Sequence, residues 1–264
     1  MALDVDWNLS GKRRADLGRY CASAVDDGSR LVCDHRDACK ASCGSHDFAE
    51  GQLSHVGSAY ELTDAGRALR ILVVSKQTGR DHEHVTVDAR SLQVDSAKPE
   101  SALWFPRTQH MQGTSFALRT LLGLSAVAGD RVEFPRSAAH VFDCFALANA
   151  TLCSKVGRDA KGGGTPQMYR NCDDHLRETL RILEPTVIMS QGYASKGTSP
   201  ATVVAQALCI AKPKVGTPQV VGTPWGRAVF IALRHPSMSW FTIETYQDQV
   251  ERACMEARRL FLSL

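Results

Sequence analysis

Short apolar runs alternate with longer segments of helical periodicity along most of the chain. Four runs have the length and apolar content of strands buried on both faces of a sheet: residues 69–74, 140–147, 186–189 and 227–233. Apolar side chains at helical spacing predict four helices, which are residues 114–122, 168–183, 198–210 and 243–262. This alternation is typical of a parallel sheet covered by helices on both sides. We therefore expect a three-layer α/β/α fold with a central, mostly parallel four-stranded sheet.

The first quarter of the chain has a different pattern. Residues 11–27 predict a helix, whereas residues 33–59 are polar, cysteine-bearing and weakly periodic, which is typical of a loop. We expect residues 1–66 to form this N-terminal helix and loop, packed on a main α/β domain of residues 67–264. No internal repeat divides the chain further, so we expect one compact unit overall.

Composition narrows the class of protein. Apolar residues make up 44% and charged residues 22% of the chain, as in ordinary globular proteins, and the net charge of +3 permits a nucleic-acid-binding face without requiring one. No apolar run approaches the roughly 18 residues that a membrane-spanning helix needs. Acidic residues stand near the N-terminus, where a signal peptide needs positive charge. We therefore expect a cytoplasmic protein that does not bind membranes.

Nine cysteines in a cytoplasmic chain favour metal ligands or core residues over disulfides. Three of them, Cys144, Cys209 and Cys254, lie in apolar periodic segments, which predicts core positions. Four others lie in polar surroundings on two predicted loops, namely Cys39, Cys43, Cys153 and Cys172. Four thiolates from two loops can hold a four-iron cluster, a local zinc site is the alternative, and spacing alone leaves both open. The candidate zinc ligands are Cys33, His35, Cys39, Cys43 and His46.

Several motifs occur in the order found in a known family. Asn149-Ala-Thr-Leu-Cys153 follows a predicted strand and is similar to the Asn-x-x-Lys-Cys motif of family 4 uracil-DNA glycosylases. Cys172 then follows after a loop, as the family's fourth cluster cysteine does. Residues 180–192 resemble the family's helix, Leu-x-Pro, apolar strand and glycine, and His235-Pro-Ser237 matches its His-Pro-Ser motif. The resemblance covers roughly residues 39–260.

The resemblance implies a cofactor and roles for individual residues. The implied ligands of a 4Fe-4S cluster are Cys39, Cys43, Cys153 and Cys172. Spacing leaves open whether Cys33 replaces Cys39 or Cys43. Asn149 would hydrogen-bond the flipped base, and His235 would stabilise the negative charge that develops on it. The residues expected to contact DNA are Lys155, Arg158, Lys161, Ser237, Met238 and Trp240.

The chain departs from the family at two places in the base pocket. The family has Gly-Glu-Ala-Pro-Gly and then acidic residues, but residues 75–83 read Ser-Lys-Gln-Thr-Gly-Arg-Asp-His-Glu, which displaces the acid to Asp81 or, as second candidate, Glu83. Where the family has a Phe that stacks on uracil, this chain has His110 or Met111. We therefore expect a pocket of different shape. Its predicted lining is Lys76, Gln77, Gly79, His110, Met111 and Asn149.

These residues predict a monofunctional DNA glycosylase, a hydrolase that flips a base out of DNA and breaks its N-glycosidic bond. The predicted catalytic residues are His235, Asp81 and Asn149. The altered pocket favours a modified base, such as a hypermodified cytosine of phage DNA, and hence antiphage defence. Three alternatives stay open: uracil excision in DNA repair, a non-catalytic iron–sulfur protein that binds DNA, and a zinc-stabilised α/β protein with no role on DNA. We expect DNA as the partner and a monomeric protein.

Overall fold

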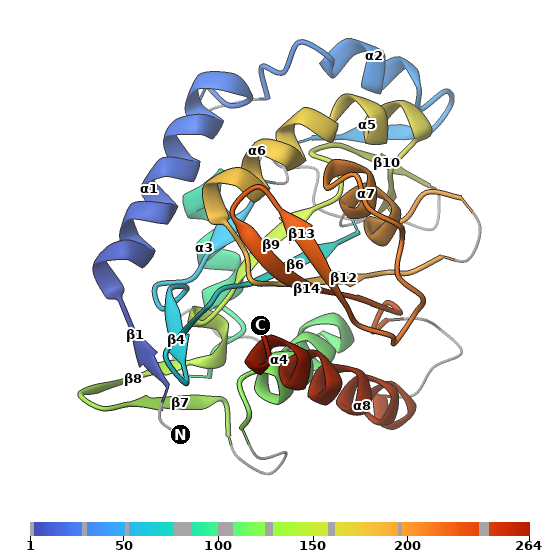
Figure 1. The fold of residues 1–264 in the computed structure, drawn as a ribbon. Helices are drawn as coiled ribbons and strands as arrows, with labels where there is room; N and C mark the ends of the chain where they lie inside the picture. Colours follow the sequence, from blue (N-terminus) through green and yellow to red (C-terminus); the bar gives the residue numbers. More distant parts are fainter. Residues whose placement is uncertain are drawn as a thin grey trace.

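The centre of the fold is a mixed sheet of six strands (Figure 1). The computed structural model describes residues 3–27, 31–50, 53–76, 86–99, 108–124, 129–157, 162–194, 197–237 and 243–264. Across the sheet the strands are β13 (Gln219–Thr223), β14 (Gly226–Leu233), β12 (Val187–Gln191), β6 (Ile71–Ser75), β9 (Ala146–Asn149) and β3 (His55–Val56). The four inner strands run parallel to one another, whereas the edge strands β13 and β3 are antiparallel to their neighbours.

The prediction of a four-stranded sheet is wrong because it omits both edge strands. β3 has only two residues and lies in a segment whose polar composition predicts a loop. β13 is mostly half-buried or exposed and contains Gly222, so it has no continuous apolar run. The four predicted runs do overlap the four inner strands, whose side chains are largely buried on both faces of the sheet. Burial on both faces is what produces a continuous apolar run in a parallel strand.

Helices cover both faces of the sheet, because successive strand side chains point to opposite faces. Leu72 and Val74 of β6 belong to one apolar core, and Ile71 and Val73 belong to the other. The helices of the first face are α1 (Trp7–Ala24), α5 (Pro166–Asn171), α6 (Asp173–Leu183) and α7 (Pro200–Ala207). The helices of the second face are α4 (Gln109–Leu121) and α8 (Ile243–Leu262), and α3 (Val87–Asp95) contacts β3 at the sheet edge.

The N-terminal region is more regular than its sequence indicates. Helix α1 confirms the predicted helix but begins at Trp7, because the side chain of Asp6 accepts a hydrogen bond from Leu9 N at 2.8 Å and caps it. The segment 33–59 is not a loop throughout. It contains α2 (Arg36–Ala41), β2 (Asp47–Ala49) and β3, which are too short to show periodicity. Two further small sheets are β1 (Asp4–Val5) with β4 (Leu62–Asp64) and β5 (Arg67–Leu69), and β2 with β10 (Ser154–Val156) and β11 (Gly162–Gly163).

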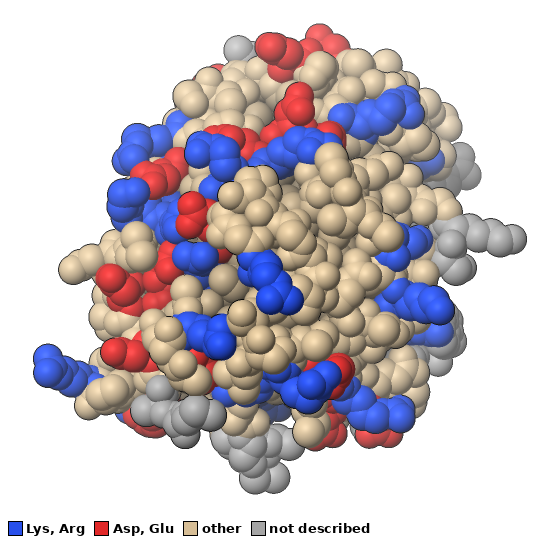
Figure 2. All heavy atoms as spheres, viewed as in Figure 1, with Lys and Arg blue, Asp and Glu red and all other residues tan. Residues whose placement is uncertain are grey.

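Charged side chains are mixed in sign over the visible surface. Figure 2 shows Lys and Arg interspersed with Asp and Glu on the face drawn. Some of these charges pair within one helix, as Arg177 does with Asp173 at 2.8 Å and Arg181 with Glu178 at 2.5 Å on α6. Such exposed pairs contribute little to stability. Among the described helices, none combines the length and the apolar character needed to cross a lipid bilayer.

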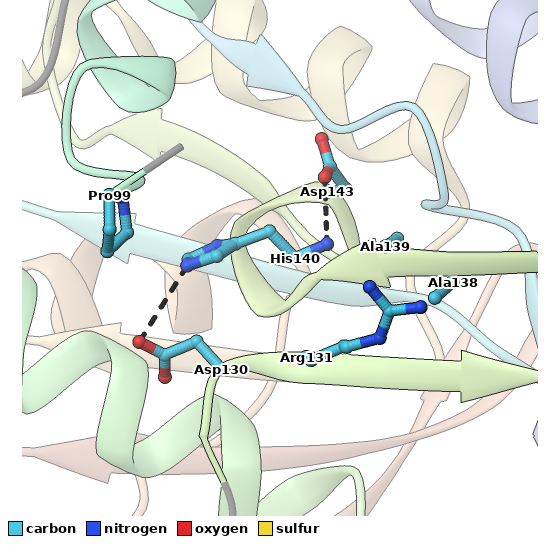
Figure 3. A pocket seen from close by; sticks show the side chains of 7 residues that line it. All are labelled: Pro99, Asp130, Arg131, Ala138, Ala139, His140 and Asp143. Atoms are coloured by element: carbon cyan, nitrogen blue, oxygen red, sulfur yellow. Dashed lines mark hydrogen bonds and ion pairs between the residues drawn. The ribbon is translucent and has the colours of Figure 1, made fainter. Parts of the chain in front are cut away.

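Residues 140–147 do not form the continuous strand that their composition predicts. β7 (Arg131–Phe134) and β8 (Ser137–His140) form a hairpin, and a short 3₁₀ helix, Val141–Asp143, precedes β9. His140 Nδ1 accepts a hydrogen bond from Phe142 N at 3.0 Å, and His140 N donates to Asp143 Oδ2 at 3.1 Å (Figure 3). The apolar run therefore reflects a turn buried in the core, where Val141 and Phe142 are fully enclosed.

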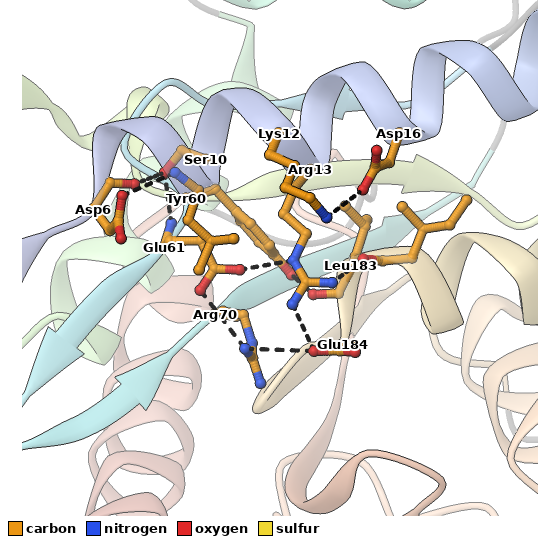
Figure 4. A network of polar contacts seen from close by, with 12 residues as sticks. Asp6, Ser10, Lys12, Arg13, Asp16, Tyr60, Glu61, Arg70, Leu183 and Glu184 are labelled. Carbon is orange, nitrogen blue, oxygen red and sulfur yellow. Dashed lines mark hydrogen bonds and ion pairs between the residues drawn. The ribbon is translucent and has the colours of Figure 1, made fainter.

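A buried polar network joins α1 to the sheet (Figure 4). Arg13 donates to Glu61 Oε1 at 2.8 Å, to Glu184 Oε2 at 2.5 Å and to the carbonyl of Ile182 at 2.6 Å. Arg70 NH1 lies 3.6 Å from Glu61 Oε2, on the side of that carboxylate away from Arg13. Two arginines thus compensate one buried carboxylate, and the network connects residues more than 160 positions apart in the chain.

Candidate functional site

The polar residues singled out in the sequence gather at the carboxyl edge of the sheet. Asn149 is the last residue of β9, and it lies opposite Ser75, the last residue of β6, in the parallel register. Gln191 ends β12 opposite Leu233, the last residue of β14, and His235 follows two positions later. In open α/β sheets this edge is where ligands bind. The described ends of the four inner strands therefore define the candidate site.

Two histidines from different elements stack at this edge. His110, in the first turn of α4, lies with its ring centroid 5.0 Å from that of His235, at an interplanar angle of 23°. Burial lowers the pKa of His235 to about 4, and nearby Lys76 lowers it further. Burial also lowers the pKa of His110 to about 3, with smaller contributions from His235 and Arg90. Both imidazoles are therefore neutral at pH 7.

Hydrogen bonding defines which nitrogen of His235 carries the proton. Ser237 N donates to His235 Nδ1 at 3.2 Å, so Nδ1 is an acceptor. A neutral imidazole has one N–H, and the proton must then be on Nε2. On His110, the buried Nδ1 atom makes no hydrogen bond within the described part of the chain. The His235 ring is thus set as a donor through Nε2, whereas the His110 ring has a buried nitrogen without a hydrogen bond in the described part of the chain.

The other described residues of the predicted pocket differ in burial and in what they contact. Asn149 is buried at its strand end. Lys76 is exposed, and its aliphatic stem lies against the backbone of Gly192, where an added Cβ would be 2.9 Å from Lys76 Cγ. Met111 packs against the core of the second face. Of the two candidates for the stacking position, His110 is the one whose ring stacks on His235.

Several predicted residues lie outside the part of the chain that the structure describes. For the base pocket these are Gln77, Gly79, Asp81 and the second acid candidate Glu83. For the DNA-facing surface they are Arg158, Lys161, Met238 and Trp240. Of the remaining predicted DNA contacts, Ser237 is exposed and Lys155 is half-buried on β10. The described part of the candidate site therefore comprises His110, His235, Asn149 and Lys76.

The four predicted cluster cysteines come from segments that are distant in sequence. Cys39 lies in α2, Cys43 follows that helix, Cys153 lies between β9 and β10, and Cys172 lies between α5 and α6. Figure 1 shows α2, α5 and β10 close together at one corner of the molecule. Their polar sequence surroundings suggested exposed loops, but all four thiols are buried. α2 packs directly on α5, which brings these segments together.

Polar groups from neighbouring segments surround these sulfur atoms. Asn171 Nδ2 donates to Cys39 Sγ at 3.3 Å, and Leu152 N donates to Cys172 Sγ at 3.4 Å. Burial raises the pKa of the Cys172 thiol to about 12, and burial also raises the pKa of Cys153. The N–H of Leu152 acts in the opposite direction on Cys172. Both donors would stabilise sulfur in its thiolate form.

Cys33 interacts electrostatically with three of the other thiols, whereas Cys43 interacts with Cys39. Cys33 contributes to the raised pKa values of Cys39, Cys153 and Cys172. Cys43 contributes to none of these, and its own Sγ donates to the carbonyl of Cys39 at 3.6 Å. Within the described residues, no three or more Cys, His, Asp or Glu side chains form a group that could hold a metal ion. Neither the predicted cluster cysteines nor the predicted zinc ligands, all of which are described, form such a group.

A separate cavity of about 540 Å³ lies beside the β7–β8 hairpin, before the start of β9 (Figure 3). It is lined by residues that no motif in the sequence singled out, among them Asp130, His140 and Asp143. His140 Nε2 lies 3.7 Å from Asp130 Oδ2, and Asp143 pairs with Lys98 at 2.7 Å. Because these polar side chains pair with one another within the protein, the cavity offers fewer groups to a ligand than the carboxyl edge of the sheet.

Comparison with known proteins does not assign a family. No protein-family model matches this sequence, and no curated protein matches it either. The chemistry of the site is therefore inferred from its own residues and their geometry.

Proposed function

We propose that this protein is a monofunctional DNA glycosylase that excises a modified base. The observation that carries the proposal is the pair of neutral, stacked imidazoles of His110 and His235 at the carboxyl edge of the sheet, the same edge at which β9 ends in Asn149. Imidazole and amide groups offer both donors and acceptors, which is what recognition of a base edge requires. A base inside a duplex cannot reach such a site, so the nucleotide would have to be flipped out.

His235 is the proposed electrostatic contributor to bond cleavage. When the bond between base and sugar breaks, negative charge develops on the base. The Nε2–H of neutral His235 can donate a hydrogen bond to a base carbonyl as this charge grows, and its orientation is already set by the bond from Ser237 N to Nδ1. Asn149 would hold the base edge. Asp81 is the proposed acid that positions water near the cationic sugar.

The proposed substrate carries a polar substituent on the base. The Lys76 side chain runs along the Gly192 backbone and is close enough to His235 to lower its pKa. Its ammonium group can donate to a hydroxyl, for example on a sugar attached to hydroxymethylcytosine. A site whose polar groups are satisfied only by such a substituent discriminates against a plain base. This chemistry favours phage-type modified cytosine over uracil, and hence a role in antiphage defence.

A 4Fe-4S cluster is part of the proposal, because buried cysteines from distant segments supply the four thiolates that such a cluster needs. Four sulfur ligands of such a cluster bind different iron atoms, so they need not converge on one point as the ligands of a single ion do. Cys33 contributes to the raised pKa values of Cys39, Cys153 and Cys172, whereas Cys43 contributes to none of the three. Cys33 and these three would hold the cluster, and Cys43 would not. When bound, the cluster would supply a covalent link among the segments around α2 and α5, whereas hydrolysis of a glycosidic bond transfers no electrons.

The proposal is tested with purified protein and duplexes that differ in one base. The duplexes carry uracil, hydroxymethylcytosine or glucosylated hydroxymethylcytosine at the same position, and abasic sites are measured under single-turnover conditions. The wild type is expected to excise the glucosylated base fastest, and His235→Ala to lose about 100- to 1,000-fold in rate, as removal of one such donor typically does. Met255→Ala, at an exposed position of α8, serves as the control and should retain the wild-type rate.

The outcomes separate the alternative functions. Faster excision of uracil than of the modified bases would return the protein to ordinary DNA repair. Binding to DNA without abasic sites on any duplex would indicate a non-catalytic iron–sulfur protein. A colourless protein that contains zinc and no iron would exclude the cluster.

A further inference from the structure

A fully buried glutamine lies beneath the candidate site. Gln191 is the last residue of β12, and its side chain is 0% exposed. This polar residue ends a strand whose first three residues, Val187, Ile188 and Met189, belong to the apolar cores. Burying an amide is unfavourable unless its oxygen and nitrogen form hydrogen bonds. Its partners therefore indicate what this residue holds together.

Gln191 connects three elements that surround the site. Its Oε1 accepts hydrogen bonds from Ser75 Oγ and from Thr114 Oγ1, both at 3.1 Å. Its Nε2 donates to Tyr246 OH at 3.4 Å. Ser75 belongs to β6, Thr114 to α4 and Tyr246 to α8. One amide thus links the ends of two neighbouring strands to both helices of the second face.

Two of these elements, α4 and β6, carry or adjoin residues of the site. The single proton of the Thr114 hydroxyl is shared between Gln191 Oε1 and the carbonyl of His110, which lies 2.9 Å from Oγ1 and one helical turn earlier in α4. Ser75 directly precedes Lys76 and pairs in register with Asn149. Only the hydroxyl of Thr114 therefore separates the buried amide from the backbone of His110.

Gly113 brings the same helix close to the turn that carries His235. A Cβ added at Gly113 would lie 2.7 Å from Pro236 Cβ and 2.8 Å from Tyr246 Cε1. Glycine inside a helix costs about 1 kcal/mol relative to alanine, and here the close approach accounts for its presence. α4 thus packs against both the turn after β14 and the ring of Tyr246, whose hydroxyl accepts the hydrogen bond from Gln191.

We propose that Gln191 is a positioning residue that holds α4 in the register at which His110 stacks on His235. The proposal rests on the proposed glycosylase function for its effect on rate, but the geometry of the two rings can be measured without any substrate. An apolar side chain at position 191 would leave the hydroxyls of Ser75, Thr114 and Tyr246 without this amide. The first turn of α4 would then be free to move relative to His235. Misplacement by about 1 Å can lower a reaction rate about 100-fold.

The experiment compares Gln191→Met, Thr114→Val and Gln191→Glu with the wild type. Met keeps the length of the side chain without its hydrogen bonds, Val keeps the shape of Thr without its hydroxyl, and Glu keeps an acceptor oxygen. Gln219→Met is the matched control, because the Gln219 amide donates to a loop carbonyl of Ala211 at the far edge of the sheet. Nuclear Overhauser effects between the protons of the two rings, the inter-ring contacts, are measured by NMR. The ring resonances are assigned from His110→Gln and His235→Gln variants.

Wild type and Gln219→Met are expected to show the inter-ring contacts, Gln191→Met and Thr114→Val to lose or weaken them, and Gln191→Glu to retain part of them. Thr114→Val removes only one hydroxyl, so it tests the proposal even if Gln191→Met fails to fold. Undiminished inter-ring contacts in a folded Gln191→Met or Thr114→Val protein would overturn the positioning role of Gln191.

Excision assays then separate this proposal from the proposed function. If the wild type excises a base, Gln191→Met is expected to lose about 10- to 100-fold in single-turnover rate with little change in DNA affinity. If the inter-ring contacts depend on Gln191 but the wild type excises no base from any duplex, the positioning role stands and the glycosylase function fails.

Discussion

Replacing Arg13 with Met removes the cation at the centre of the buried network that joins α1 to the sheet (Figure 4). The Arg13 side chain is 14% exposed, and the Glu61 side chain that it contacts is 5% exposed. Met preserves much of the aliphatic volume, so the change acts mainly on charge and hydrogen bonding. It leaves the Glu61 carboxylate with Arg70 NH1 at 3.6 Å as its remaining cation in the network.

The expected loss follows from the burial of these groups. Removing one partner of a buried ion pair costs about 3–5 kcal/mol, because the other charge stays buried without compensation. The lower end applies here, since Arg70 still neutralises part of the charge and the Glu184 side chain is 36% exposed and reaches water. We therefore expect the free energy of unfolding to fall by about 3 kcal/mol. For a chain of this size that corresponds to a fall in Tm of roughly 6–12 °C.

Urea and thermal unfolding, followed by circular dichroism, measure this loss. Lys12→Met is the matched control on the same helix. Lys12 is 68% exposed in its 3.2 Å pair with Asp16, so its loss should change stability by less than about 1 kcal/mol. Adding Glu61→Gln to Arg13→Met removes the uncompensated charge and should restore part of the stability. Equal unfolding midpoints for Arg13→Met and Lys12→Met would refute the reasoning.

Three further predictions concern the cysteines, the histidines and the α4 contact. Cys33→Ser is expected to lower the iron and sulfide content of freshly purified protein, whereas Cys43→Ser keeps it; the reverse result would assign Cys43 as the ligand. Four histidines of the described chain have pKa values lowered by burial, namely His55, His175 and His235 at about 4 and His110 at about 3. The unfolded chain binds these protons near pH 6.5, whereas the folded protein binds them only near pH 4 or below. The free energy of unfolding should therefore fall as the pH is lowered between these values. The expected fall is up to about 1.4 kcal/mol per pH unit for each histidine. Urea midpoints that stay constant from pH 7 to pH 4.5 would contradict this pH dependence. Gly113→Ala should cost about 1–3 kcal/mol through overpacking against Pro236 and Tyr246, whereas Gly11→Ala, with nothing within 4 Å of an added Cβ, should be neutral or slightly stabilising.

The sequence by itself determined the inner layer of the fold and the types of residue at the site. Strands buried on both faces need continuous apolar side chains, so β6, β12 and β14 appear directly in the sequence. The position of His235 just after β14 follows from the same pattern. Cysteines in polar segments could likewise be recognised from residue order alone. These features are local, and local features are readable from periodicity and composition.

Only the tertiary structure decided which of these residues meet. The edge strand β3 and helix α2 have no periodic signal because they are stabilised by partners more than 90 positions away in the chain, in β9 and α5. The stack of His110 on His235 and the hydrogen bonds of Gln191 depend on the seating of α4 against the sheet, to which no single segment contributes a pattern. The same holds for Cys33, whose nearness to Cys153 and Cys172 arises where distant segments pack together. Contacts of this kind are set by strand register and helix packing, which are properties of the whole fold.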